Sequence, residues 1–351
     1  MVDETINPQI KPGSEGGIQA LRIRAPVDLA PAFAAQAAAV ASEADQGEFA
    51  WTNGAFAQDL IQQQSRRLEK LHSKVLADRD PEPLHQMRVS LRRLRTALLQ
   101  FGAALELPAS VSERRIAAVA RRTSRCRDLD VLRLRLRDQL LPLLPGDEQR
   151  SLERAMKRLG RDRARAFSRL VDGLHSSRYR TLLNQLKTWQ KHPRFTPLGQ
   201  RSLLPWLVDW QAPFTAGLAL HPGWGEEDPN AEVLHGLRKR IKAARYSLEN
   251  FECWCSPPLL AWINDLRQAQ DHLGELHDLQ LFNRNLAACV GRRKRSALPV
   301  LRAEIEGQTL QHWRCWRELS QRLLRDSHRH SLQRELLALG QRDHRFGDDV
   351  Q

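Results

Sequence analysis

One stretch of this sequence carries several basic residues and no acidic ones. It reads LHQMRVSLRRLRTALLQF and covers residues 84–101. On a helical wheel, His85, Arg88, Arg92 and Arg95 fall within an arc of roughly 80°, beside a broader apolar stripe. A solvated helix face usually mixes charges of both signs. Because a guanidinium group fits phosphate oxygens as a rigid fork, the stretch predicts a polyanionic partner.

The same pattern recurs 150 residues further along the chain. The stretch LHGLRKRIKAARYSLENF, residues 234–251, aligns with the first without a gap, and Lys242 takes the place of Arg92. The same shift aligns HDLQLF with RDLDVL, and SHRHSL with SRYRTL. This single register predicts an internal duplication with a first repeat at about 56–190, a connector at 191–205 and a second repeat at about 206–340.

The elements that position these stretches are predicted to be helices. Apolar residues recur at three- and four-residue intervals, and no alternating runs of β-branched residues indicate strands. The predicted fold class is all-α, and each repeat is long enough to form a helical bundle. In the first repeat we expect helices near 55–77, 84–105, 110–124, 128–143, 148–174 and 178–190, with counterparts 150 residues later.

The charge of the chain is strongly positive and unevenly distributed. The 351 residues carry a net charge of +14, with 46 arginines and 9 lysines. Residues 1–55 hold three basic and seven acidic residues, a net charge of −4, which leaves +18 for the remainder. We therefore predict an acidic, largely irregular extension at 1–54 that could recruit a protein partner. A helical domain at 55–343 and a C-terminal tail at 344–351 follow.

The cysteines and the hydropathy indicate a soluble protein of a reducing compartment. Cys126, Cys253, Cys255, Cys289 and Cys315 are sparse and lack paired metal-ligand spacing. The N-terminus has no apolar core of signal-peptide length, and no stretch approaches the ~20 apolar residues of a membrane span. We expect a cytoplasmic protein without a metal ion or cofactor.

The two basic motifs, taken together, closely resemble those of the CHAD domain, the conserved histidine α-helical domain. They are His-x-x-Arg-x-x-x-Arg-Arg-x-Arg from His85 and His-x-x-Arg-Lys-x-x-Lys-x-x-Arg-Tyr from His235, each followed by an Asp-Leu pair. The resemblance covers about 56–340. It departs at the second Asp-Leu pair, where His277 replaces the usual Asn, and at the first, which reads TSRCRDL without a Leu-Gly start.

This resemblance implies two four-helix bundles related by a pseudo-twofold axis, with a basic channel or groove where they meet. It also implies binding of inorganic polyphosphate, which could target the protein to polyphosphate granules. Two basic helices that face each other would focus the field in the gap, and a long anion would release counterions on binding. Carried over position by position, the binding residues would be His85, Arg88, Arg92, Arg93, Arg95, His235, Arg238, Lys239, Lys242 and Arg245.

The histidines and the paired aspartates have alternative interpretations. His85 and His235 lie in the first turns of their helices, where they could donate to phosphate or could simply pack and bond a backbone carbonyl. Metal ligation is weakly indicated, because no second ligand lies at i+4. Asp128 and Asp278 are interpreted as helix caps, or as acids that hold a neighbouring arginine.

Two other classes of function compete with polyphosphate binding. A phosphate-transferring or phosphohydrolase accessory enzyme would need a phosphate-binding glycine loop, clustered carboxylates or an activated nucleophile, and the sequence shows none. We therefore predict no catalytic residues. A nucleic-acid-binding protein is the runner-up, although its basic helices would be expected to expose aromatic residues for base stacking.

Overall fold

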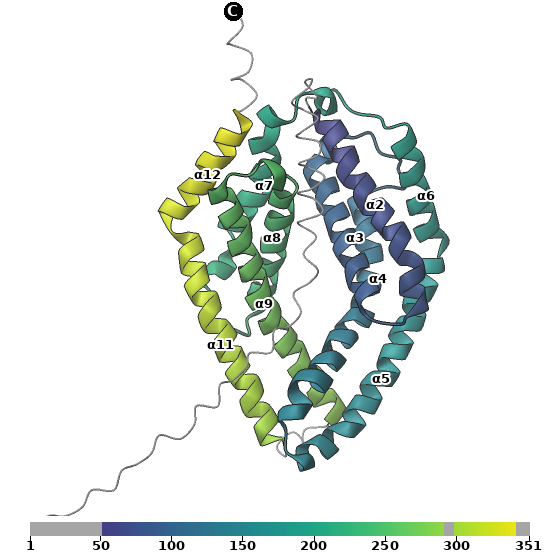
Figure 1. Ribbon diagram of the computed structural model, residues 1–351, viewed down its shortest axis with the longest axis vertical. Coiled ribbons are helices and arrows are strands. Elements are labelled where there is room, and N and C mark those ends of the chain that lie inside the picture. The colour runs from purple at the N-terminus through teal and green to yellow at the C-terminus, as the bar shows by residue number, and fades with distance from the viewer. Residues whose placement is uncertain (1–50, 291–297, 342–351) are drawn as a thin grey trace, which may run out of the picture. The chain divides into compact units, whose positions relative to one another are not determined.

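Figure 1 shows the protein as a computed structural model, which describes residues 51–290 and 298–341. Every named element in these residues is a helix, so the predicted all-α fold is confirmed. Strand-like pairing occurs there only as two isolated bridges, Thr52 with Ser202 and Leu105 with Phe195. Apart from residues 51–54, the predicted N-terminal extension lies outside the described residues, as does the predicted C-terminal tail.

Five helices follow one another in the first repeat. They are α2 (Asn53–Ala77), α3 (Glu82–Phe101), α4 (Glu113–Leu134), α5 (Gly146–His175) and α6 (Ser177–Lys191). α2 packs on α3, α3 on α4 and α4 on α5, while α6 contacts both α2 and α5. The apolar stripe of α3 faces this core, and Leu91 and Leu94 are at most 1% exposed.

The second repeat follows the same order. Its helices are α7 (Leu207–Ala219), α8 (Glu232–Glu249), α9 (Pro257–Val290), α11 (Pro299–Leu324) and α12 (Asp326–Gly340). α7 packs on α8, α8 on α9 and α9 on α11, and α12 contacts α7, α9 and α11. The basic helices α3 and α8 begin 150 residues apart, as the register of the predicted duplication requires.

Equivalent residues of the two repeats contact each other where α3 meets α8. Asn250 donates a hydrogen bond of 2.8 Å to the side-chain oxygen of Gln100, which lies 150 residues earlier. The rings of Phe101 and Phe251, also 150 residues apart, have centroids 6.0 Å from each other. A self-complementary contact of this kind is what a twofold relation between two halves would produce.

The two repeats share one core and are interlocked. Phe56 stacks on Phe251 at 5.4 Å, and Phe101 lies 5.2 Å from Trp210, so buried aromatic rings from both repeats form a common layer. α9 also reaches across to pack on α5 (Figure 1). Glu148 of α5 accepts hydrogen bonds from the first backbone N–H groups of α11, at 2.9 and 3.0 Å.

The helix boundaries differ from prediction at the two Asp-Leu pairs. Two separate helices were expected at 110–124 and 128–143, but α4 is continuous from Glu113 to Leu134 and passes into a π-helical turn over Arg135–Leu140. Thr123 and Ser124 bond back to the carbonyl of Ala120 and so do not cap a new helix. α9 is likewise continuous through Asp278. The interpretation of Asp128 and Asp278 as helix caps is therefore wrong.

Candidate polyanion-binding site

The basic helices begin and pack as their sequences dictate. Pro83 lies in the first turn of α3, where its missing N–H costs nothing. His85 and His235 are each the fourth residue of their helix, which confirms their predicted first-turn position. Leu84 and Leu234 point into the core and are about 95% buried. The next residue of each helix, His85 or His235, is therefore directed toward the edge of the core.

Eight half-buried side chains from four helices form what we call the central basic cluster. Three come from α3, three from α8 and one each from α4 and α9. They are His85, Arg88, Arg92, Arg127, His235, Arg238, Lys242 and His277.

The cations of the two repeats lie close enough to destabilise one another's charge. Burial lowers the pKa of Lys242 well below its ordinary value, and Arg238 and Arg92 lower it further. Burial also lowers the pKa of Arg88 to about 10, with contributions from Arg92 and, across the interface, from Arg238. Like charges in a shared low-dielectric space disfavour the charged form. The cluster is thus a site of concentrated positive potential built by both repeats.

The three histidines of the cluster are neutral at pH 7. Burial and then Arg127 lower the pKa of His85 to about 4. Burial and then His277 lower the pKa of His235 to about 4, and these two rings stack with centroids 4.3 Å apart. The pKa of His277 also falls to about 4, through burial and then Arg238. Each ring is therefore a neutral donor or acceptor surrounded by cations.

Hydrogen bonding fixes one cation and leaves others with free donors. One guanidinium nitrogen of Arg88 donates to the hydroxyls of Thr123 and Ser124 on α4, at 2.9 and 2.8 Å. By contrast, Nε of Arg92, Nε of Arg238 and Nδ1 of His235 are buried without a hydrogen-bond partner in the described part of the chain. Buried donors in folded proteins are nearly always satisfied. The two guanidinium Nε–H groups are therefore suited to bind an anion, and Nδ1 of His235 is suited to do so in the tautomer that carries the proton on that nitrogen.

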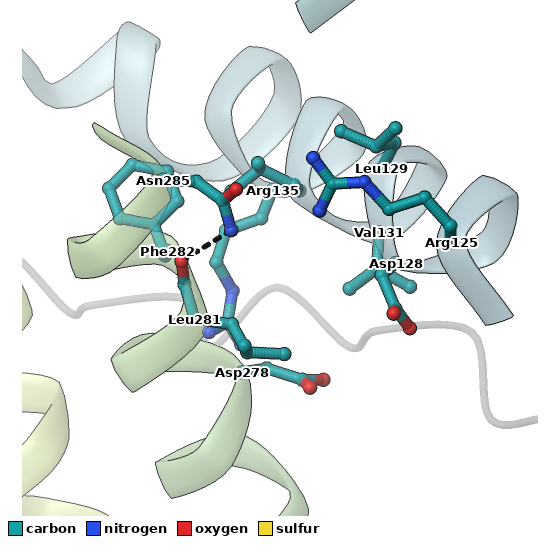
Figure 2. Close-up of a pocket in the computed structure, with 10 residues that line it drawn as sticks. Arg125, Asp128, Leu129, Val131, Arg135, Asp278, Leu281, Phe282 and Asn285 are labelled. Carbon is teal, nitrogen blue, oxygen red and sulfur yellow. Dashed lines mark hydrogen bonds between the residues drawn. The ribbon is translucent and has the colours of Figure 1, made fainter. Parts of the chain in front are cut away.

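Two carboxylates border the cluster. Asp128 of α4 and Asp278 of α9 line one pocket, together with Arg125 and Asn285, and Figure 2 shows both carboxylates directed away from the pocket's apolar side chains. Burial raises the pKa of Asp128, Arg88 opposes this, and Asp278 adds to it. The two acids offset part of the cluster's charge.

Three of the ten predicted binding residues are engaged by carboxylates instead. Arg93 and Arg245 bond the 2%-exposed side chain of Glu249 at 2.7 and 2.9 Å, and both guanidinium groups lie over the ring of Tyr246. Arg95 pairs with Glu113 at the start of α4.

The remaining seven predicted residues are brought together. Six of them are members of the central basic cluster. The seventh, Lys239, is exposed at its edge, where it lowers the pKa of His235 and of His277.

Two members of the cluster, Arg127 and His277, were not predicted to bind. They occupy equivalent positions, because the 150-residue register places RDL at 127–129 on HDL at 277–279. Each also lies beside the equivalent histidine, Arg127 by His85 and His277 by His235. The 150-residue alignment of the two repeats could therefore have predicted both residues as members of the cluster.

No group of three or more potential metal-ligating side chains occurs among residues 51–290 and 298–341. Within the same ranges, no helix combines the length and apolar character needed to cross a membrane.

Comparison with known proteins gives a family and a fold. A family model described as the CHAD domain matches residues 59–287. The crystal structure of the CHAD domain from the plant Ricinus communis matches with a TM-score of 0.58 and 22% identity, over 84% of this chain and 94% of that one. PptA from Streptomyces chartreusis matches with a TM-score of 0.54 and 17% identity, over 82% and 99%. No curated protein matches the chain.

Proposed function

The chain belongs to the CHAD domain family, and we propose that it binds inorganic polyphosphate, without catalysis, at the central basic cluster. The observation that carries the proposal is the placement of cations from α3 and α8 against each other. Arg88 and Arg238, and likewise Arg92 and Lys242, act on each other's charge although they belong to different repeats. A ligand with many negative charges would remove this repulsion.

Polyphosphate suits the site better than a nucleic acid does. Tyr246, an aromatic residue of the basic helix α8, is 4% exposed and is covered by Arg93 and Arg245, so it offers no surface for a base. The free donors are the guanidinium Nε–H groups of Arg92 and Arg238, which bond phosphate oxygens strongly. Binding through phosphate alone would also place the protein on polyphosphate granules.

The proposal is tested by titration of long-chain polyphosphate with a matched pair of double variants. Arg92→Gln/Lys242→Gln removes one cation from each repeat within the cluster. At about 1.5 kcal/mol for each charge-assisted contact, affinity should fall about 100-fold. The control, Arg114→Gln/Arg240→Gln, removes the same charge from exposed positions of α4 and α8 and should change affinity less than threefold. Equal losses in the two variants would contradict a site at the cluster.

Two further measurements address the ligand and the absence of catalysis. Long polyphosphate should displace single-stranded RNA and duplex DNA at equal phosphate concentration, and better binding of RNA would favour the nucleic-acid alternative. Incubation with Mg²⁺ should leave the polymer length unchanged. Release of phosphate that is lost in the Arg92→Gln/Lys242→Gln variant would contradict non-enzymatic binding.

A further inference from the structure

The outer face of α5 carries a second concentration of positive charge. Its seven exposed cations fall within an arc of about 120° on the helical wheel and span about 29 Å of helix. Glu153 and Asp162 lie on either side of this arc, and two acidic residues, Asp147 and Asp172, lie within it just beyond its two ends. We call this face the α5 basic stripe; it consists of Arg150, Arg154, Lys157, Arg158, Arg161, Arg165 and Arg169.

The α5 basic stripe opposes the stability of its own helix. Five pairs of its cations are spaced i and i+4, an arrangement in which like charges repel. Arg165 approaches Asp162 at 3.7 Å with 75% of its side chain exposed, and an ion pair as exposed as this contributes little to stability. A solvated helix face without a partner usually mixes charges of both signs. The stripe is therefore better suited to an anionic partner than to water alone.

The equivalent helix of the second repeat provides an internal comparison. α11 packs on α9 as α5 packs on α4, so both helices hold the same place in their repeats. None of the seven positions is basic in α11. The residues 150 positions later are Val300, Glu304, Gly307, Gln308, Gln311, Cys315 and Leu319. The fold thus tolerates other residues at these positions and does not require the charge.

Exposed arginines connect the stripe to the central basic cluster. Arg125 of α4 lies by Asp128, at the border of the cluster. One turn earlier, the side chain of Arg122 lies against Gly173 of α5, 3.2 Å from where a Cβ would stand. Both arginines are exposed. A polymer that leaves the cluster along α4 would reach the C-terminal end of the stripe, near Arg169.

The composition of the stripe selects the class of partner. It contains no aromatic residue for base stacking and no large apolar residue for insertion into a membrane. Seven cations in a straight row match a flexible polyanion that can follow the helix, whereas each phosphate strand of a rigid duplex winds around the duplex axis and away from the row. We propose that the α5 basic stripe is a second binding track, along which a long polyphosphate chain held in the central basic cluster continues. This proposal rests on the proposed function.

A matched pair of fourfold variants tests the second track. The stripe variant, Arg154→Gln/Lys157→Gln/Arg161→Gln/Arg169→Gln, removes four charges from α5 and keeps residues of good helix propensity. The control variant removes four charges from exposed positions of α11, α12 and the junction between them. Its substitutions are Arg314→Gln, Arg325→Gln, Arg329→Gln and Arg334→Gln. Both proteins should keep the circular dichroism of the unaltered chain.

The stripe variant should bind tripolyphosphate within twofold of the unaltered chain, because the short ligand needs only the cluster. Its affinity for long-chain polyphosphate should fall at least tenfold. Each neutralised phosphate contributes about 0.7 to the slope of log K against log salt concentration. Loss of four contacts should therefore make this slope shallower by about 3. The control variant should change long-chain affinity less than threefold. Equal long-chain affinities of the two variants would overturn the second track.

Two further outcomes would overturn the second track. If Arg92→Gln/Lys242→Gln leaves both ligands unaffected while the stripe variant loses the long chain, the cluster is not the primary site and a track that continues from it is overturned too. If the stripe variant loses duplex DNA but keeps long polyphosphate, the stripe serves nucleic acid and the proposed track is wrong.

Discussion

Binding of a polyanion to the central basic cluster should draw protons into the protein. In the free protein, His85 faces Arg88 and Arg92 of its own helix, Arg127 of α4 and Lys242 of α8, and its pKa is lowered to about 4 by burial and these cations. His235 and His277 have the same pKa of about 4. A polyanion that neutralises the cations should return each pKa toward its ordinary value of about 6.5.

The size of the effect follows from these pKa values. At pH 6, a histidine with a pKa of about 4 is roughly 1% protonated, and one with a pKa of about 6.5 is roughly 75% protonated. Because His235 and His277 stack at 4.3 Å, we expect only one of the two to gain a proton. Together with His85, this gives an uptake of at most about 1.5 protons, because burial, the largest cause of the lowered pKa values, persists in the complex. Linkage then strengthens binding by at most about 20-fold per titrating histidine between pH 7 and pH 5.

Calorimetric titration with long-chain polyphosphate at pH 6 measures this uptake directly. The observed enthalpy, plotted against the ionisation enthalpy of a series of buffers, has a slope equal to the number of protons bound. The variant His85→Asn/His277→Asn leaves His235 as the one titrating histidine of the cluster and should halve the slope, to at most about 0.75. A slope of zero for the unaltered protein, or a release of protons, would refute the reasoning.

The remaining predictions concern stability and the shared site. The pKa of each of the three histidines is lower in the folded protein than in the unfolded chain, so the unfolded chain binds more protons between about pH 6.5 and pH 4. The free energy of unfolding of the free protein, measured in urea titrations, should therefore decrease as the pH is lowered from about 6.5 to about 4. Glu249→Gln leaves three arginines without their carboxylate and should lower that free energy by about 3 kcal/mol, whereas a loss below 1 kcal/mol would contradict a structural role for the network. The stripe variant removes five like-charge pairs and should raise it by about 1–2 kcal/mol, and an unchanged value would refute the repulsion. Finally, Arg88→Gln/Arg92→Gln and Arg238→Gln/Lys242→Gln should each weaken long polyphosphate more than tenfold at unchanged stoichiometry; a halved stoichiometry at unchanged affinity would instead indicate two separate sites.

Most of the correct predictions about the fold and the site came from helical periodicity. The apolar and basic stripes of residues 84–101 and 234–251 fix which side of each helix is buried, and α3 and α8 pack as these stripes require. The helical wheel places Arg95 in the same arc as Arg88, but it could not predict that Arg95 forms an ion pair instead of joining the central basic cluster. Its partner Glu113 belongs to another helix, so only the tertiary packing brings the two together.

Buried ion pairs and continuous helices were the features that local sequence could not predict. Arg93 and Arg245 look equivalent to the cluster cations in sequence, but both meet Glu249, which is buried between the repeats. Asp128 and Asp278 were interpreted as capping residues because aspartate is common at helix starts. Side-chain bonds from Thr123 and Ser124 to the preceding turn let α4 continue through this region.

The shared aromatic layer has a consequence for synthesis of the chain. On the ribosome, α2 to α6 emerge before α7, so Phe56 and Phe101 lack Trp210 and Phe251 until the second repeat has been made. The backbone N–H groups of α11 that donate to Glu148 are synthesised later still. A nascent first repeat therefore exposes an aggregation-prone apolar face that is complementary to the similar face of the second repeat. We expect release from the ribosome to precede the last step of folding, and truncated first repeats to pair with one another.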